Sequence, residues 1–257
     1  MKKVLPRLLL SLILLVSVLL AAFKFPGYKK INIVFIGDSI TQGADNKVAY
    51  APSGYAITYL RDKLPAVTVN QANAGVSGRT TLDFLPGQID FINAAKAADT
   101  LYTDKNAQLV FSIMLGTNDS AVKGPHGAPV APQDYKHNLS TIIDTLLQRY
   151  PNSKIVINHP IWYSPNTYNN AMYLAEGLAR LQTYFPEIDG IVKSYKLTNP
   201  GHVFIGDKAG FAYFKKNYAN TFKFEQGRKG VFYLHPNEKG ASGLGELWGK
   251  AIYKALK

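Results

Sequence analysis

Five short apolar segments, separated by stretches with helical periodicity, constrain the fold of this chain most strongly. The apolar segments are residues 31–36, 67–71, 108–115, 154–158 and 202–205. The pattern predicts helices over residues 55–64, 82–98, 134–150, 168–185 and 242–256. Continuous apolar strands that alternate with helices are typical of an α/β protein whose parallel sheet is covered by helices on both faces. Ligands of such sheets bind beyond the carboxyl ends of the strands.

The N-terminal residues differ from the rest of the chain. Lys2, Lys3 and Arg7 precede an apolar run over residues 8–23. This run is shorter than the roughly 20 residues that span a bilayer and resembles the apolar region of a signal peptide. We predict a signal peptide over residues 1–23, with an uncleaved N-terminal anchor as the alternative, and a single domain over residues 24–257. The protein is then secreted or periplasmic, and it contacts a membrane only through an uncleaved leader.

Composition excludes several classes of site. The chain has no cysteine, which excludes a thiol nucleophile and thiolate metal sites. Its formal net charge of +12 is compatible with nucleic-acid binding, but the basic residues are dispersed and no nucleic-acid-binding motif accompanies them. Histidines and carboxylates do not cluster at metal-ligand spacing. We therefore expect no nucleic-acid partner, no metal and no cofactor.

Polar or glycine-rich motifs follow the first three predicted strands. Gly-Asp-Ser at residues 37–39 comes directly after the first strand, Gly78 lies in the segment after the second, and Asn118 follows the third. His235 stands shortly before the last predicted helix. Each motif alone also suits an ordinary turn or helix cap. Because the first three follow successive strands, we expect them to meet at one edge of the sheet.

Ser39, Gly78, Asn118 and His235 resemble the four residues after which the SGNH (GDSL) hydrolase family is named. The resemblance covers the whole chain after the leader and implies ester hydrolysis by a three-layer α/β/α, flavodoxin-like fold with a mostly parallel five-stranded sheet. It also implies Ser39 as nucleophile, His235 as base, and an oxyanion hole made by the N–H groups of Ser39 and Gly78 and the amide of Asn118. A serine hydroxyl needs such a base near neutral pH, and the tetrahedral intermediate needs such donors.

His159 is the main rival of His235 as the base. It also follows a predicted strand and precedes a proline. We favour His235 because the base of the family is the last of the four residues along the chain.

One position departs from the family pattern. The family has an aspartate three residues before the catalytic histidine, where this chain has Phe232. Our first expectation is a Ser–His dyad whose imidazole is oriented by a backbone carbonyl. A carboxylate from elsewhere and a catalytically weak protein are the alternatives; the candidate carboxylates are Glu225, Asp207 and Glu238.

Three further residues are candidates for substrate binding. Trp162 and Tyr163 follow the fourth strand and are suited to stack on a sugar ring, with packing in the core as the alternative. His126 lies in a Gly-Pro-His-Gly loop after the third strand.

The motifs are most similar to those of bacterial carbohydrate O-acetylesterases that act on sialic acid or xylan. We therefore expect an acylated carbohydrate or another small ester as substrate. The alternatives are a lysophospholipase or thioesterase at the cell envelope, and a catalytically weak glycan-binding protein.

Overall fold

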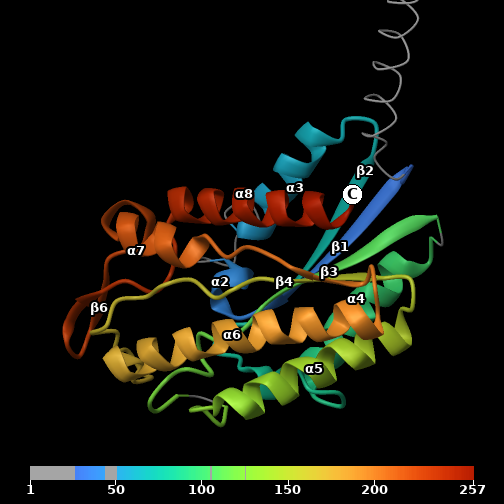
Figure 1. The fold of residues 1–257 in the computed structure, drawn as a ribbon. Helices are drawn as coiled ribbons and strands as arrows, with labels where there is room; N and C mark the ends of the chain where they lie inside the picture. The colour runs from blue at the N-terminus through green and yellow to red at the C-terminus, as the bar shows by residue number, and fades with distance from the viewer. Residues whose placement is uncertain (1–26, 44–50, 105, 125) are drawn as a thin grey trace, which may run out of the picture.

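The computed structural model describes residues 27–43, 51–104, 106–124 and 126–257, so the predicted leader lies outside the described residues. A five-stranded sheet forms its centre, with the strand order β2-β1-β3-β4-β5 and every neighbouring pair parallel (Figure 1). The strands are β1 (Lys30–Gly37), β2 (Thr68–Gly75), β3 (Ala107–Met114), β4 (Lys154–Ile157) and β5 (Val203–Ile205). The expected three-layer α/β/α fold is confirmed.

Strand β1 shows why the apolar runs predict this arrangement. Ile31, Ile33 and Phe35 pack into the hydrophobic core on one face of the sheet, whereas Val34 and Ile36 pack into the core on the other face. Side chains alternate along a strand, so a strand covered on both faces needs apolar residues on both. The one buried amide of β1, that of Asn32, has hydrogen bonds at both its oxygen and its nitrogen. β2 is an edge strand, and it extends past the predicted end at residue 71 through Ala-Asn-Ala-Gly, a stretch of small residues and one amide that is too weakly apolar for the pattern to detect.

Helices cover both faces (Figure 1). The helices are α2 (Ser39–Gln42), α3 (Pro52–Lys63), the 3-10 helix η2 (Thr81–Phe84), α4 (Ile89–Tyr102), α5 (Pro132–Arg149), α6 (Leu174–Thr198), α7 (Gly210–Thr221) and α8 (Glu238–Ala255). Apolar side chains of α3 and α8 pack into the core on one face of the sheet, and those of α4, α5 and α6 pack into the core on the other face. Within the described residues, no helix combines the length and apolar character needed to cross a membrane.

Two predicted helices differ from the observed ones. The helix expected over residues 82–98 is divided, because Pro86 and Gly87, which has a φ of 91°, separate η2 from α4. The helix expected over residues 168–185 instead runs from residue 174 to 198, through Pro186. Burial of Ile188 and Ile191 beyond that proline offsets its missing hydrogen bond.

The segment after β5 holds elements that the sequence pattern did not predict. These are α7 and a two-stranded antiparallel hairpin of β6 (Glu225–Gly227) and β7 (Gly230–Phe232).

The C-terminal ends of the parallel strands form one edge of the sheet, its carboxyl edge. Two buried aspartate side chains lie beneath it. Asp38 accepts a hydrogen bond from the N–H of Ile40 at 2.9 Å and so caps α2. Asp119 accepts from the N–H of Thr81 at 2.9 Å and from its hydroxyl at 2.5 Å, and so joins the loop after β3 to the loop after β2. Burial raises the pKa of each carboxyl to about 6.

A first prediction concerns the close packing of α3 against α8. A Cβ at Gly245 would lie 2.4 Å from the carbonyl oxygen of Pro52 and 2.5 Å from Cβ of Tyr55. Gly245→Ala is therefore expected to lower the free energy of unfolding by about 1–3 kcal/mol in urea titrations. Gly190→Ala is the matched control, because its Cβ would meet only the end of the Lys136 side chain at 3.9 Å. The control should be neutral or stabilising by up to about 1 kcal/mol; equal losses in both variants would contradict the packing argument.

A second prediction concerns Asp119. The pKa of the Asp119 carboxyl is raised in the folded state, so between about pH 4 and about pH 6 the folded protein keeps the carboxyl protonated while the unfolded chain ionises it. The contribution of Asp119 to stability therefore falls as pH rises from about 4 to about 6. Asp119→Asn removes that dependence. Urea titrations at several pH values should show the variant gaining stability relative to the wild type across this range, by at most about 1.4 kcal/mol per pH unit. A difference that does not vary with pH would contradict a raised pKa.

Candidate active site

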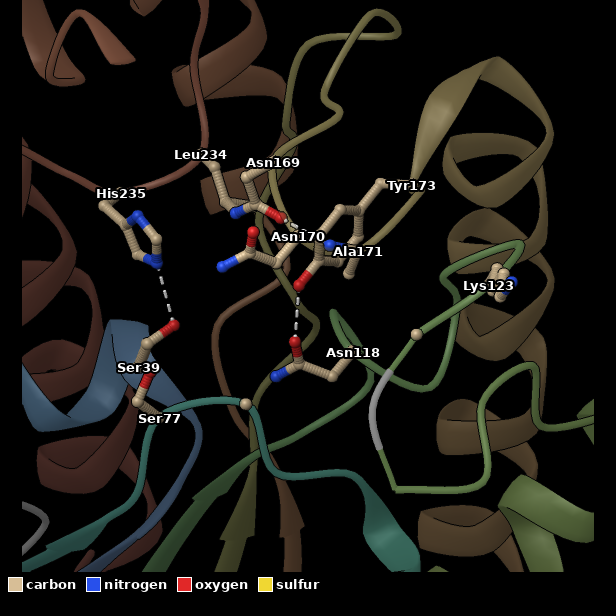
Figure 2. A pocket seen from close by; sticks show the side chains of 12 residues that line it. Ser39, Ser77, Asn118, Lys123, Asn169, Asn170, Ala171, Tyr173, Leu234 and His235 are labelled. Carbon is tan, nitrogen blue, oxygen red and sulfur yellow. Dashed lines mark hydrogen bonds between the residues drawn. The ribbon is translucent and has the colours of Figure 1, made fainter. Parts of the chain in front are cut away.

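Ser39 and His235 meet at the carboxyl edge of the sheet. Ser39 is the first residue of α2, directly after β1, and His235 lies between β7 and α8. Ser39 Oγ is 2.9 Å from His235 Nε2 (Figure 2). The rival His159 is buried elsewhere, stacked on Phe185 and 3.1 Å from Asp189. Of the two candidate bases, the structure brings only His235 to Ser39.

Glycine at position 37 permits the tight turn that presents Ser39. A Cβ there would lie 2.6 Å from the carbonyl oxygen of Met114 and 2.0 Å from the hydroxyl oxygen of Thr41. Any side chain would therefore push β1 and β3 apart or displace α2. The Gly-Asp-Ser motif is thus explained by packing at Gly37, helix capping at Asp38 and the half-buried Ser39, whose hydroxyl contacts His235.

The cavity beside Ser39 is lined by residues with N–H groups that are available as donors, namely Ser39, Gly78 and Asn118. Asn118 is held at both ends of its amide, because its Oδ1 accepts from the Tyr173 hydroxyl at 2.6 Å and its Nδ2 donates to the carbonyl oxygen of Arg79 at 2.9 Å. An amide nitrogen carries two protons, so one remains for a ligand. Gly78 has a φ of 79°, and the structure shows no hydrogen bond from its N–H or from that of Ser39 within the described residues.

These groups line a cavity of about 440 Å³ (Figure 2). Its lining residues are Ser39, Ser77, Gly78, Asn118, Lys123, Gly124, Asn169, Asn170, Ala171, Tyr173, Leu234 and His235. Eight of the twelve lining residues carry polar side chains, and the segment over residues 169–171 supplies one wall. The apolar pattern does not predict this wall, because it assigns residues 168–173 to the start of a helix that in fact begins at Leu174.

A carboxylate, and not a backbone carbonyl, contacts Nδ1 of His235. Glu225 Oε2 lies 2.8 Å from His235 Nδ1, and Glu225 Oε1 accepts from the backbone N–H of His235 at 2.9 Å. The first expectation of a carbonyl partner is therefore wrong, and Glu225 is the carboxylate among the three candidates that reaches the ring. Asp207 instead caps α7, and Glu238 lies 3.4 Å from the Tyr55 hydroxyl. Burial raises the pKa of Glu225, but the hydrogen bonds and charge of His235 outweigh burial and hold it below its usual value.

The expectation that Trp162 and Tyr163 face the cleft is wrong. Trp162 is 7% exposed and packs against Tyr218 and Phe222. Tyr163 is buried, with its hydroxyl 2.9 Å from Ser120 Oγ. Both rings fill the core, as the alternative interpretation had it, because the chain after β4 turns them inward and away from the cavity.

His126 also lies outside the cavity lining. Its Nδ1 is 2.8 Å from Asp83 and its Nε2 is 2.8 Å from a guanidinium nitrogen of Arg79. Arg79 also pairs with Asp90 at 2.6 Å. His126 therefore supports the loop that carries Gly78, and its predicted contact with substrate is not supported by this position.

The part of the chain that the structure describes contains no group of three or more histidine, cysteine or carboxylate side chains placed to hold a metal ion.

Comparisons with known proteins agree with this architecture. Solved structures with a similar fold include the lipase/acylhydrolase from Enterococcus faecalis (19% identity, TM-score 0.57, covering 88% of this chain and 97% of that chain). They also include the carbohydrate acetylesterase Est24 from Sinorhizobium meliloti (16% identity, TM-score 0.56, covering 87% of this chain and 99% of that chain). A third is a variant of the acetyl xylan esterase Axe2 from Geobacillus stearothermophilus (16% identity, TM-score 0.55, covering 88% of this chain and 94% of that chain). No curated protein matches the chain.

At these identities the similar structures establish the fold alone. The family is established by the sequence, since residues 35–242 match the model of the GDSL-like lipase/acylhydrolase family. That match includes all four residues from which the resemblance was drawn. The chain therefore belongs to the GDSL-like lipase/acylhydrolase family, the SGNH hydrolases.

Proposed function

We propose that the protein is a serine ester hydrolase with Ser39 as nucleophile and His235 as general base. The observation that carries this proposal is the 2.9 Å contact between Ser39 Oγ and His235 Nε2 at the floor of a cavity lined by N–H donors. Since Nδ1 of His235 faces a carboxylate that only accepts hydrogen bonds, the ring proton belongs on Nδ1 and Nε2 is free to accept. Ser39 is then the donor to His235.

The reaction follows from this arrangement. His235 Nε2 removes the hydroxyl proton as Ser39 Oγ attacks the ester carbonyl carbon. The N–H groups of Ser39 and Gly78 and the free amide proton of Asn118 stabilise the negative oxygen of the tetrahedral intermediate. His235 passes its proton to the departing alcohol, which leaves the acyl group on Ser39. A water molecule then gives a proton to His235 Nε2 as its oxygen attacks the acyl carbon, and the bond to Ser39 Oγ breaks as Oγ takes that proton and the acid leaves.

The proposed substrate is an O-acetylated carbohydrate. The amides of Asn169 and Asn170 and the hydroxyl of Ser77 line the cavity, and such groups suit the hydroxyls of a sugar better than a long acyl chain. The resemblance of the sequence motifs to carbohydrate O-acetylesterases supports the same substrate class. So does the fold likeness to Est24 and Axe2, although that likeness alone does not assign a substrate.

Activity of three variants tests the proposed chemistry. With p-nitrophenyl acetate, Ser39→Ala and His235→Ala are each expected to lower kcat by at least about 10⁴-fold. Asn118→Ala should lower it by about 10²–10³-fold, as expected for one oxyanion donor. His159→Ala is the control and should keep most of the activity. Loss of activity in His159→Ala with retention in His235→Ala would exchange the roles of the two histidines.

The choice of ester tests the proposed substrate class. We expect acetate release from acetylated xylan oligosaccharides and acetylated monosaccharides, and falling kcat/KM along p-nitrophenyl esters of increasing acyl length. Faster turnover of long acyl esters or of a lysophospholipid would instead indicate a lipid-directed acylhydrolase. Binding of acetylated sugar without acetate release would indicate a glycan-binding protein.

A further inference from the structure

The hairpin of β6 and β7 brings a carboxylate to His235 from an unexpected direction. Phe232 occupies the position three residues before His235, and its ring is 2% exposed within the core. In the antiparallel ladder, the residue directly opposite Phe232 is Glu225. Directly opposed residues have Cβ atoms about 4.5–5.5 Å apart, so a side chain from β6 can reach the space beside the histidine.

We propose that Glu225 is the positioning residue of the active site, supplied across the hairpin in place of an aspartate three residues before the histidine. This inference rests on the proposed serine-hydrolase function. Glu225 touches no atom of the reacting ester; it acts through His235, whose ring it holds in place.

Both carboxylate oxygens of Glu225 contact the same residue. Oε2 lies 2.8 Å from Nδ1 of His235, and Oε1 accepts from the backbone N–H of His235 at 2.9 Å. The first contact fixes the tautomer and the rotation of the ring, and the second fixes the ring's own backbone relative to the same carboxylate. A negative charge at Nδ1 also stabilises the imidazolium that forms when His235 takes the proton of Ser39.

The hairpin is held in place by the segment that continues into the cavity wall. Asn166 Nδ2 donates to the carbonyl oxygens of Val231 at 2.7 Å and Lys229 at 3.2 Å. The backbone N–H of Arg228 donates to the carbonyl oxygen of Tyr168 at 2.8 Å. Residues 169–171 follow directly and line the cavity. The position of the Glu225 carboxylate and the shape of the substrate site therefore depend on the same contacts.

Glu225→Gln is the decisive variant because it keeps the shape of the side chain. Its amide oxygen can still accept from the backbone N–H of His235, but its amide nitrogen then faces Nδ1 and favours the tautomer with the proton on Nε2. That tautomer cannot accept the proton of Ser39. We expect kcat for p-nitrophenyl acetate to fall by about 10²–10⁴-fold with little change in KM. Glu225→Asp, which keeps the charge, should recover part of the loss.

The pH profile separates positioning from a merely structural role. Without the carboxylate, the imidazolium of His235 is less stable, so the acid limb of the kcat/KM profile should move to lower pH in Glu225→Gln. Glu238→Gln is the matched control, since that carboxylate lies on α8 with the Tyr55 hydroxyl as its partner, and its profile should match the wild type. A folded Glu225→Gln with wild-type kcat and an unshifted acid limb would overturn the proposal.

A second measurement does not depend on turnover. Proton NMR should show a low-field Nδ1–H resonance of His235 in the wild type and in Ser39→Ala, assigned by its loss in His235→Gln, and absent in Glu225→Gln. If the wild type hydrolyses no ester, but the resonance is present in the wild type and absent in Glu225→Gln, the proposed function fails and the positioning role stands. If Ser39→Ala abolishes activity while the resonance and the activity both persist in Glu225→Gln, the positioning role fails and the proposed function stands.

Discussion

Burial of the parallel sheet on both faces is the constraint on which the rest of the structure depends. Apolar side chains pack on both faces of β1, and the polar groups of the site lie beyond the ends of the strands. The register then fixes where those ends lie, because Gly37 pairs with Gly75 on one side and with Met114 on the other. The loops that carry Ser39, Gly78 and Asn118 therefore leave the sheet at the same level. A rigid sheet holds all three groups without any one loop having to be rigid by itself.

Two carboxyl groups buried beneath this edge lower the stability of the folded protein. Asp38 and Asp119 are fully buried, and burial raises the pKa of each. Each side chain nevertheless fixes a backbone segment of the site: Asp38 caps the helix that begins with Ser39, and Asp119 holds Thr81 in the loop that follows Gly78. Replacing them with apolar residues would remove the cost of burial and also the hydrogen bonds that place these loops.

Features of this fold that are encoded in one continuous stretch of sequence could be predicted, whereas contacts between separate segments could not. The strands and the groups at Ser39, Gly78 and Asn118 were predictable because apolar runs and the motifs after them lie in continuous stretches of the chain. Glu225 was one of three candidate carboxylates for His235, but the choice among them was not predictable, since Glu225 belongs to a three-residue strand whose pairing no periodicity indicates. Trp162 was misplaced for a different reason: aromatic composition suits a core and a sugar platform equally, and only packing decides between them.

The carboxylate beside His235 comes from Glu225 on the neighbouring strand, while the position three residues before the histidine holds Phe232. An aspartate at position 232 would lie on β7, the strand that leads to His235, whereas Glu225 reaches the ring from the neighbouring strand β6 with a side chain one methylene longer. Phe232 is then free to pack in the core, which ties β7 to the rest of the protein through apolar burial. Phe232 thus anchors the strand and Glu225 carries the negative charge, whereas an aspartate at position 232 would have to do both. Because the ladder holds them opposite one another, the packing of the one fixes the backbone from which the other reaches the histidine.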